Sequence, residues 1–221
     1  MTSVGLIGSG RIGGTVAKLA VAAGHPVILS NSRGPDTLKD LAGRLGPLAR
    51  ASTGRDAAEG DLVVIAIPLR AYRDVAAGPL TGKVVIDANN YYPQRDGHIP
   101  ELDSGALTSS ELMQRHFAQS TVVKVFNNIY FRHLASLSRA SGAPDRSFLP
   151  IAGDGARAKS AVTVFLDSIG YGAVDAGPLA ESWRQEPGTP VYGSPYGPFE
   201  DENGSPAGEE AVRAALAAAS R

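Results

Sequence analysis

The chain contains no cysteine and carries almost no net charge, and both absences restrict its function. Without thiols it forms no disulfide and offers no thiolate to a metal or a substrate. Its 21 basic and 22 acidic residues leave a formal charge of −1, which gives no indication of a nucleic-acid partner. The longest apolar stretch, 62–69, is far too short to cross a bilayer, and the first predicted strand begins at Val4, which leaves no room for a signal peptide. We expect a cytoplasmic protein with no membrane and no nucleic-acid partner.

Glycines near the amino terminus form the pattern Gly-x-Gly-x-x-Gly directly after the first predicted strand (4–7) and directly before a predicted helix. In this order of elements the pattern is typical of a dinucleotide-binding turn. The free N–H groups at the start of the helix bind phosphates without a cationic side chain. The predicted phosphate-binding residues are Gly8, Ser9, Gly10, Arg11, Ile12 and Gly13. A similar run at 153–158 ends in alanine and contains Asp154, which would repel a pyrophosphate, so we expect Asp154 to be a helix N-cap instead.

The residues after the second predicted strand (26–30) predict which dinucleotide binds. An NAD-binding chain usually places an acid about 20 residues after the glycines, where the acid holds the ribose 2′-hydroxyl. The corresponding segment here contains Asn31, Ser32 and Arg33 and no carboxylate. These donors suit a 2′-phosphate, which an acid would repel. We therefore predict NADP(H) as the cofactor. The alternative is a polar turn with Arg33 in water.

Short apolar runs alternate with helical patterns along the whole chain, and this alternation predicts an α/β fold. We expect a Rossmann-type, doubly wound, mainly parallel sheet. Its eight predicted strands are 4–7, 26–30, 48–51, 62–67, 84–87, 122–126, 148–152 and 172–175. Residues 1–184 are expected to form the NADP-binding domain, and residues 185–221 a carboxy-terminal arm and short helix.

Two features of the helical segments carry further expectations. Thr108 and Glu111 fit the capping box of a helix from Ser109. Prolines recur between 186 and 206 among glycine and tyrosine, so this stretch cannot sustain a helix or a central strand. We expect an extended Pro/Tyr-rich arm across the surface, followed by a helix with Ser205 as its N-cap.

Ligands of an open parallel sheet lie beyond the carboxyl ends of its strands, so the residues after each strand are the candidate site. Ile67, Pro68 and Leu69 leave the strand nearest the reversal of strand order, and we expect them against the nicotinamide or its ribose. The candidate pocket for a second substrate contains Asn89, Asn127, Asn128 and Tyr130. The asparagines suit a carboxamide or a heterocycle edge, although each could equally cap its own turn.

Several catalytic motifs are absent. No tyrosine is followed by lysine four residues later, no Gly-x-Ser-x-Gly occurs, and the four histidines show no metal-ligand spacing. His116 and His133 fall in predicted helices, where we expect solvated faces. We therefore assign no firm catalytic residue and no metal. Such a protein suits direct hydride transfer to an acceptor that carries its own electronic sink.

Six short motifs follow one another along the chain: 8–13, 31–33, 65–68, 123–129, 150–154 and 175–179. Together they resemble the F420-dependent NADP oxidoreductases over residues 1–184. That family is in turn similar to the cytoplasmic oxidoreductase domains of the STEAP metalloreductases. The resemblance implies hydride exchange between the nicotinamide and a deazaflavin, coenzyme F420. It also implies Ser32 and Arg33 at the 2′-phosphate, and the turn after Phe126 as the floor between the two rings.

The chain departs from this family at 89–107 and at its carboxy terminus, where the proline- and tyrosine-rich arm replaces the usual apolar helix. The small-molecule redox acceptor therefore stays open between F420 and a flavin, with Tyr91, Tyr92, Tyr130 and Trp183 as a candidate aromatic floor. The same amino-terminal domain occurs in pyrroline-carboxylate reductases and 3-hydroxyacid dehydrogenases. Reduction of a small imine or ketone is the alternative. We expect the protein to be a homodimer, which could also enclose such a small substrate. A non-catalytic NADPH-sensing protein is a third interpretation.

Overall fold

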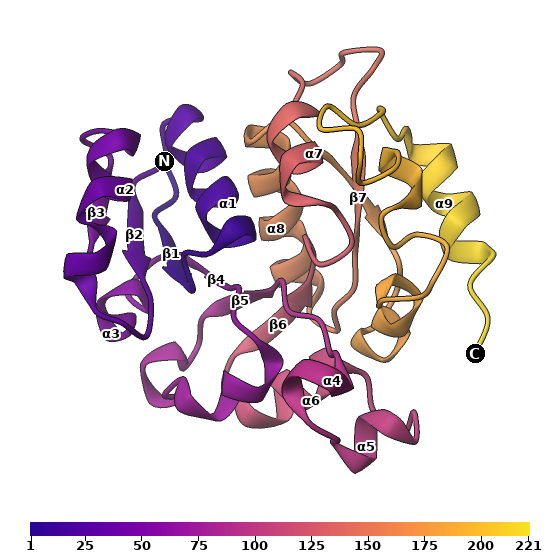
Figure 1. The fold of residues 1–221 in the computed structure, drawn as a ribbon, viewed down its shortest axis with the longest axis horizontal. Helices are drawn as coiled ribbons and strands as arrows, with labels where there is room; N and C mark the ends of the chain where they lie inside the picture. Colours follow the sequence, from indigo (N-terminus) through magenta and orange to yellow (C-terminus); the bar gives the residue numbers. More distant parts are fainter.

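A six-stranded, all-parallel sheet forms the first part of the molecule (Figure 1). In this computed structural model, which describes residues 1–221, the strands lie in the order β3-β2-β1-β4-β5-β6. They are β1 (Val4–Ile7), β2 (Val27–Ser30), β3 (Ala49–Ala51), β4 (Leu62–Ile65), β5 (Val84–Asp87) and β6 (Thr121–Lys124). The order reverses between β1 and β4, and this reversal opens a crevice beyond the carboxyl ends of the strands.

Two further strands, β7 (Phe148–Ile151) and β8 (Gly172–Asp175), form a parallel sheet of their own. An antiparallel bridge between Lys124 and Ala152 connects this small sheet to the end of β6. All eight predicted strands are therefore present, and the Rossmann-type fold is confirmed. The predicted single sheet is divided because β7 meets β6 only through this one antiparallel bridge.

Helices cover both faces of the main sheet, and alternate residues of each strand pack against opposite faces. In β4, Leu62 and Val64 belong to one apolar cluster, whereas Val63 and Ile65 belong to a second. The first cluster packs under α1 (Arg11–Ala22), α7 (Phe131–Ser136), α8 (Ala156–Ser168) and α9 (Glu209–Ala217). The second packs under α3 (Gly54–Ala57), the 3-10 helix η2 (Leu69–Asp74) and α6 (Ser109–His116). Burial of strands on both faces explains their continuous apolar runs.

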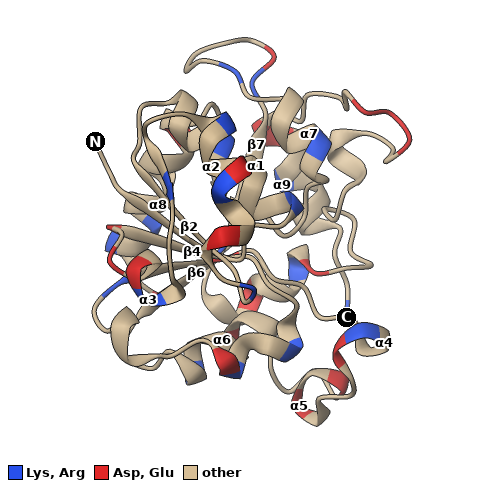
Figure 2. Ribbon diagram, turned by 60° about the vertical axis from the view of Figure 1, so that its left-hand side comes forward, with Lys and Arg blue, Asp and Glu red and all other residues tan.

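The remaining elements are short. The predicted helix over 35–45 consists of a 3-10 turn, η1 (Pro35–Leu38), followed by α2 (Lys39–Leu45). The connection after β5 contains α4 (Pro93–Asp96) and α5 (Pro100–Asp103). Three more 3-10 helices are η3 (Gly78–Leu80), η4 (Leu179–Gln185) and η5 (Ser194–Tyr196). No helix combines the length and the apolar character that a membrane crossing needs. Basic and acidic residues are interspersed over the ribbon in Figure 2.

The predicted helix caps have different outcomes. The capping box of Thr108 and Glu111 at α6 is confirmed. The expected N-cap role of Asp154 is wrong, because α8 begins after Gly155 without a side-chain cap. The Asp154 carboxylate instead accepts a hydrogen bond from the backbone N–H of Leu179, at 2.9 Å. It therefore holds the start of η4 rather than the start of α8.

Ser205 is likewise not an N-cap. The helix α9 begins after Gly208, and the backbone N–H of Ser205 donates to the carbonyl oxygen of Tyr196 at 2.9 Å. The carbonyl oxygen of Ala207 accepts from the N–H of Phe148 at 2.8 Å. These backbone contacts with β7 and η5 keep the chain non-helical until residue 208.

The carboxy-terminal segment, which we define as residues 186–208, connects η4 to α9. As its prolines predict, it holds no longer helix and no strand, only η5. It packs more deeply than a surface arm would, because Val191 and Tyr196 are fully buried in the first apolar cluster. The segment also covers His133, which is fully buried and whose Nε2 donates to the carbonyl oxygen of Asp201 at 2.6 Å. The expected solvated position of His133 is therefore wrong.

Candidate functional site

The turn between β1 and α1 has a geometry that only glycine tolerates at two positions. Gly8 has φ +97°, and a Cβ there would lie 2.3 Å from the carbonyl oxygen of Ala66. A Cβ on Gly13 would lie 2.0 Å from the carbonyl oxygen of Gly8. By contrast, a Cβ on Gly10 would meet nothing within 4 Å, so this glycine faces open space. The backbone is therefore closely packed at Gly8 and at Gly13, whereas the space beside Gly10 is open.

The first turn of α1 is free to receive an anion. No side chain caps its amino terminus, and no acidic residue occurs in its first turn. The unpaired N–H groups and the positive end of the helix macrodipole therefore face the space beside Gly10. This arrangement binds phosphates through the backbone.

A cavity of about 660 Å³, which we call the nucleotide pocket, extends from this turn along the carboxyl ends of β1, β2, β3 and β4. Eight of the predicted cofactor residues line it: Gly8, Ser9, Gly10, Asn31, Ser32, Arg33, Ile67 and Pro68. Arg11 and Ile12 line the neighbouring cavity described below. Gly13 and Leu69 line neither cavity; Leu69 is fully buried in the second apolar cluster.

Two arginines and a serine lie at the β2 end of the nucleotide pocket. The Asn31 side chain fixes the turn, because its Oδ1 accepts from the N–H of Arg33 at 2.9 Å and its Nδ2 donates to Thr37. Ser32 and Arg33 are exposed there, and the Arg33 guanidinium has neither an ion pair nor a hydrogen bond. Arg55, on α3, lines the same pocket and is equally unpaired. Sequence reasoning missed Arg55, although the strand-end rule applied to β3 would have found it.

A second cavity of about 570 Å³, which we call the tyrosine pocket, adjoins the nucleotide pocket. Ala66, Ile67 and Pro68 line both cavities, so the chain leaving β4 forms their common wall. The four predicted pocket residues Asn89, Asn127, Asn128 and Tyr130 all line the tyrosine pocket. They come from the ends of β5 and β6, as the strand-end rule predicts.

The asparagines of this pocket bond to distant segments rather than to their own turns. The Asn89 Oδ1 accepts from the backbone N–H of Ile67 at 2.8 Å and so fixes the common wall. The Asn127 Nδ2 donates to the carbonyl oxygen of Gln185 at 2.7 Å, and the Asn128 Nδ2 donates to that of Val191 at 3.0 Å. The Oδ1 atoms of Asn127 and Asn128 are buried without a partner. Both asparagines therefore connect the end of β6 to the carboxy-terminal half of the molecule.

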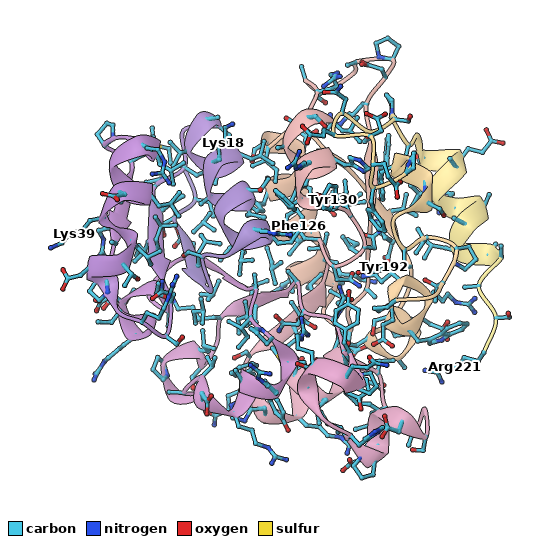
Figure 3. The ribbon with its side chains drawn as sticks, in the orientation of Figure 1. Lys18, Lys39, Phe126, Tyr130, Tyr192 and Arg221 are labelled. Atoms are coloured by element: carbon cyan, nitrogen blue, oxygen red, sulfur yellow. The ribbon has the colours of Figure 1, made fainter.

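The turn that carries these two asparagines is strained. Phe126, two residues after the end of β6, has φ +70° and is the only non-glycine residue with a positive φ. Its side chain is fully buried. A left-handed conformation costs an L-residue roughly 1–2 kcal/mol, and such strain clusters at functional sites. Figure 3 places Phe126, Tyr130 and Tyr192 near the middle of the molecule.

A buried ion pair supports the wall of the tyrosine pocket from behind. Lys124 and Asp87 are both fully buried, and the Lys124 Nζ lies 3.1 Å from the Asp87 Oδ2. The same Nζ donates to the carbonyl oxygen of Asn89 at 2.5 Å and to the Ser109 Oγ at 3.1 Å. The Ser110 hydroxyl donates to Asp87 at 2.6 Å. Because every charge has partners, this network holds Asn89 rigidly.

Aromatic and basic side chains line the outer part of the tyrosine pocket. The hydroxyls of Tyr92 and Tyr192 share a hydrogen bond, although the two residues lie 100 positions apart. The Arg95 guanidinium carbon lies 4.8 Å from the centre of the Tyr92 ring. Burial raises the pKa of Tyr192, and its bond to Tyr92 raises it further. Tyr130 packs edge-on against Phe199 with ring centres 5.4 Å apart.

Comparison with known proteins identifies the family of the amino-terminal part of the chain. Residues 3–91 match the profile of the family described as NADP oxidoreductase, coenzyme F420-dependent. A hypothetical protein, SMa0349, from Sinorhizobium meliloti is 30% identical; the alignment covers 86% of this chain and 93% of that one, with a TM-score of 0.73. A candidate F420-dependent NADP-reductase from Arthrobacter sp. FB24 is 24% identical over 82% and 87% of the chains, with a TM-score of 0.68. Residues 3–91 therefore carry the F420-dependent NADP oxidoreductase domain, and the chain shares its fold with both structures.

With this domain the chain is an NADP-dependent oxidoreductase. More distant structures share its fold. A reductive aminase from Aspergillus terreus, in complex with NADPH and ethyl levulinate, is 16% identical over 81% of this chain and 56% of that one, with a TM-score of 0.57. At this identity the likeness concerns the fold alone. Among curated proteins no match to the chain is found.

Proposed function

We propose that the protein transfers hydride between the nicotinamide of NADP(H) in the nucleotide pocket and an acceptor in the tyrosine pocket. The observation that carries this proposal is the common wall of the two cavities, formed by Ala66, Ile67 and Pro68. A dinucleotide anchored at the phosphate turn and running along this wall would end at the tyrosine pocket. Bound NADPH would supply a hydride there.

The residues of the nucleotide pocket fit a phosphorylated dinucleotide. The open cradle at Gly10 and the uncapped start of α1 would hold the pyrophosphate. Ser32 and Arg33, joined by Arg55, would hold the 2′-phosphate, because unpaired guanidinium groups bind phosphate oxygens strongly. Asp74 is the only acid that lines this pocket, and the turn after β2, residues 31–34, contains no acid. This charge distribution supports NADP(H) over NAD(H).

The tyrosine pocket fits a flat, conjugated acceptor, which we propose to be the deazaflavin F420 or a flavin-like ring. Its lining combines an apolar wall at Ile12 and Ile129 with the aromatic rings of Tyr130 and Phe199. Aromatic walls favour planar ring systems, and the protein would act chiefly by holding the two rings in register. Arg11 and Arg95 are the only charged side chains lining the pocket, so the acceptor is expected to carry an anionic group.

A small cyclic imine or ketone is the second candidate acceptor. The observation that favours it is the pair of tyrosine hydroxyls in the pocket, since such substrates need a proton as well as a hydride. The two candidates differ in what the pocket must recognise: an extended ring system in one case and a small polar bond in the other.

The test mixes the purified protein with NADPH and, separately, F420, FMN, FAD and 2-methyl-1-pyrroline, and follows the loss of nicotinamide absorbance. Oxidation with F420 or a flavin is expected. Oxidation with the imine alone would replace the proposed acceptor with the second candidate. NADPH binding without turnover on any acceptor would refute the proposed function and favour an NADPH sensor.

A further inference from the structure

Tyrosines are the only residues lining the tyrosine pocket whose side chains could act as a general acid. None of its lining residues is Asp, Glu, His, Lys, Ser or Thr. Its asparagines do not titrate, and its two arginines do not release a proton at physiological pH. The O–H groups of Tyr92, Tyr130 and Tyr192 remain. A proton donated by a side chain of this pocket therefore comes from a tyrosine.

Only two of these three hydroxyls are connected. The Tyr92 and Tyr192 hydroxyls share a hydrogen bond, whereas the Tyr130 hydroxyl has no hydrogen-bonding partner. A hydrogen-bonded pair can donate a proton through one oxygen and take up a replacement proton through the other. A single isolated hydroxyl cannot do this. Tyr92 and Tyr192 are both half-buried, so solvent can reach the hydroxyl pair and return a proton to it.

We propose that the hydroxyl pair of Tyr92 and Tyr192 supplies the proton that accompanies hydride transfer in the tyrosine pocket. This inference rests on the proposed function and adds a catalytic role that the motif search did not find. It requires no further oxidant or reductant, since NADPH is the reductant and the acceptor is the oxidant.

The hydride brings two electrons to a carbon of the acceptor, and the conjugated nitrogen or oxygen gains the displaced electron pair. A tyrosine O–H bond breaks and an N–H or O–H bond forms on the acceptor. The phenolate takes a proton from the partner tyrosine across their hydrogen bond, and solvent returns that proton.

Arg95 makes this step easier. Its guanidinium lies 4.8 Å from the centre of the Tyr92 ring and attracts the negative charge that the pair carries after donation. The Arg95 side chain is held in place by two bonds to the Asp96 carboxylate and one to the carbonyl oxygen of Asn90. Because burial raises the pKa of Tyr192, this hydroxyl carries its proton throughout the neutral range.

The experiment compares the wild type with Tyr92→Phe, Tyr192→Phe and the double variant Tyr92→Phe/Tyr192→Phe. The matched control is Tyr91→Phe, because the Tyr91 hydroxyl bonds to Gly97 and Asp103 outside the pocket. The acceptors are F420, FMN and 2-methyl-1-pyrroline. For each protein we would measure kcat, its pH profile, its solvent isotope effect in D₂O, and the NADPH dissociation constant.

The double variant is expected to lose about 10²-fold in kcat, as is typical for removal of a general acid, with the NADPH dissociation constant within about twofold of wild type. The wild-type rate should be constant from about pH 6 to about pH 9, whereas that of the double variant should fall as the pH rises. A solvent isotope effect in the wild type supports the same conclusion. Should the double variant fail to fold, each single variant should lose about tenfold and show the same pH dependence.

Two results would overturn the inference in distinguishable ways. Turnover in the wild type, with the same kcat and pH profile in the double variant or in both single variants, would overturn the proton-donor role alone. NADPH binding without turnover on any of the three acceptors would overturn both this role and the proposed function.

Discussion

The unpaired guanidinium groups of Arg33 and Arg55 lead to the most direct test of the cofactor assignment. Replacing either arginine with alanine would remove a charge-assisted hydrogen bond to the 2′-phosphate of NADPH. Such bonds contribute about 1.5–3 kcal/mol, and because Arg33 and Arg55 are both exposed we take the low end, about tenfold in affinity. The double variant Arg33→Ala/Arg55→Ala should then bind NADPH about 10²-fold more weakly. NADH lacks this phosphate, so its affinity should not change.

Isothermal titration calorimetry with NADPH and NADH measures both affinities on each variant. Arg50→Ala is the matched control, because Arg50 is exposed on the neighbouring strand β3, carries the same charge and lines neither pocket. Screening at physiological salt limits its influence to about 8 Å. An equal loss of affinity for both coenzymes would refute the assignment, as would a loss of NADPH affinity in Arg50→Ala as large as in Arg33→Ala.

Three further predictions concern the phosphate turn, the buried ion pair and the Asp96 carboxylate. Gly10→Ala should weaken NADPH binding at least about tenfold, because the added methyl group fills the space for the pyrophosphate. The control Gly43→Ala in α2, where a Cβ also meets nothing within 4 Å, should leave binding unchanged. Equal NADPH affinities in the two variants would contradict a phosphate site at Gly10. Lys124→Met should lower the free energy of unfolding in urea by about 3–5 kcal/mol, because Asp87 stays buried without its cation. The double variant Lys124→Met/Asp87→Asn should recover part of this loss. A much smaller loss of stability in Lys124→Met would argue against a buried charge. Although burial opposes it, bonds from Arg95, Tyr92 and Arg70 hold the pKa of Asp96 below its usual value, so its contribution to stability is present at neutral pH and is lost as the pH falls through the lowered pKa. The destabilisation by Asp96→Asn should accordingly shrink below about pH 4, and a penalty that does not vary with pH would contradict this.

The sequence predicted the strands well because a parallel sheet buries both faces of each strand. A short continuous apolar run such as Leu62–Ile65, with turn residues on both sides, is typical of a strand buried on both faces. The boundaries moved by one or two residues, since hydrogen bonding rather than hydropathy ends a strand. Division into two sheets was not predictable, because it depends on the single bridge between Lys124 and Ala152.

The strand-end rule predicted most of the residues that line the two cavities. It needs only the order of strands, which short-range patterns supply. It placed Asn89, Asn127 and Asn128 in one pocket, although their side chains turned out to bond to segments far along the chain. Arg55 was missed because β3 is short and half-exposed and was given no candidate residues.

Contacts between distant segments were beyond the reach of sequence patterns. Nothing in the periodicity indicates that Tyr92 and Tyr192 meet, because that depends on how the carboxy-terminal segment folds back over β6. A signal for the buried ion pair did exist: Lys124 interrupts an apolar run, and a charge in a buried strand requires a partner. Which acid would pair with it was not deducible without the register of β5 and β6.

The placement of Tyr192 and Phe199 has a consequence for how the molecule is made. Translation delivers the nucleotide-binding half first, and the six strands of its sheet are complete once Lys124 has left the ribosome. The outer lining of the tyrosine pocket is missing until Tyr192 and Phe199 have been synthesised, near the end of the 221-residue chain. A nascent or prematurely terminated chain would thus contain the binding site for the coenzyme and lack the binding site for the second substrate.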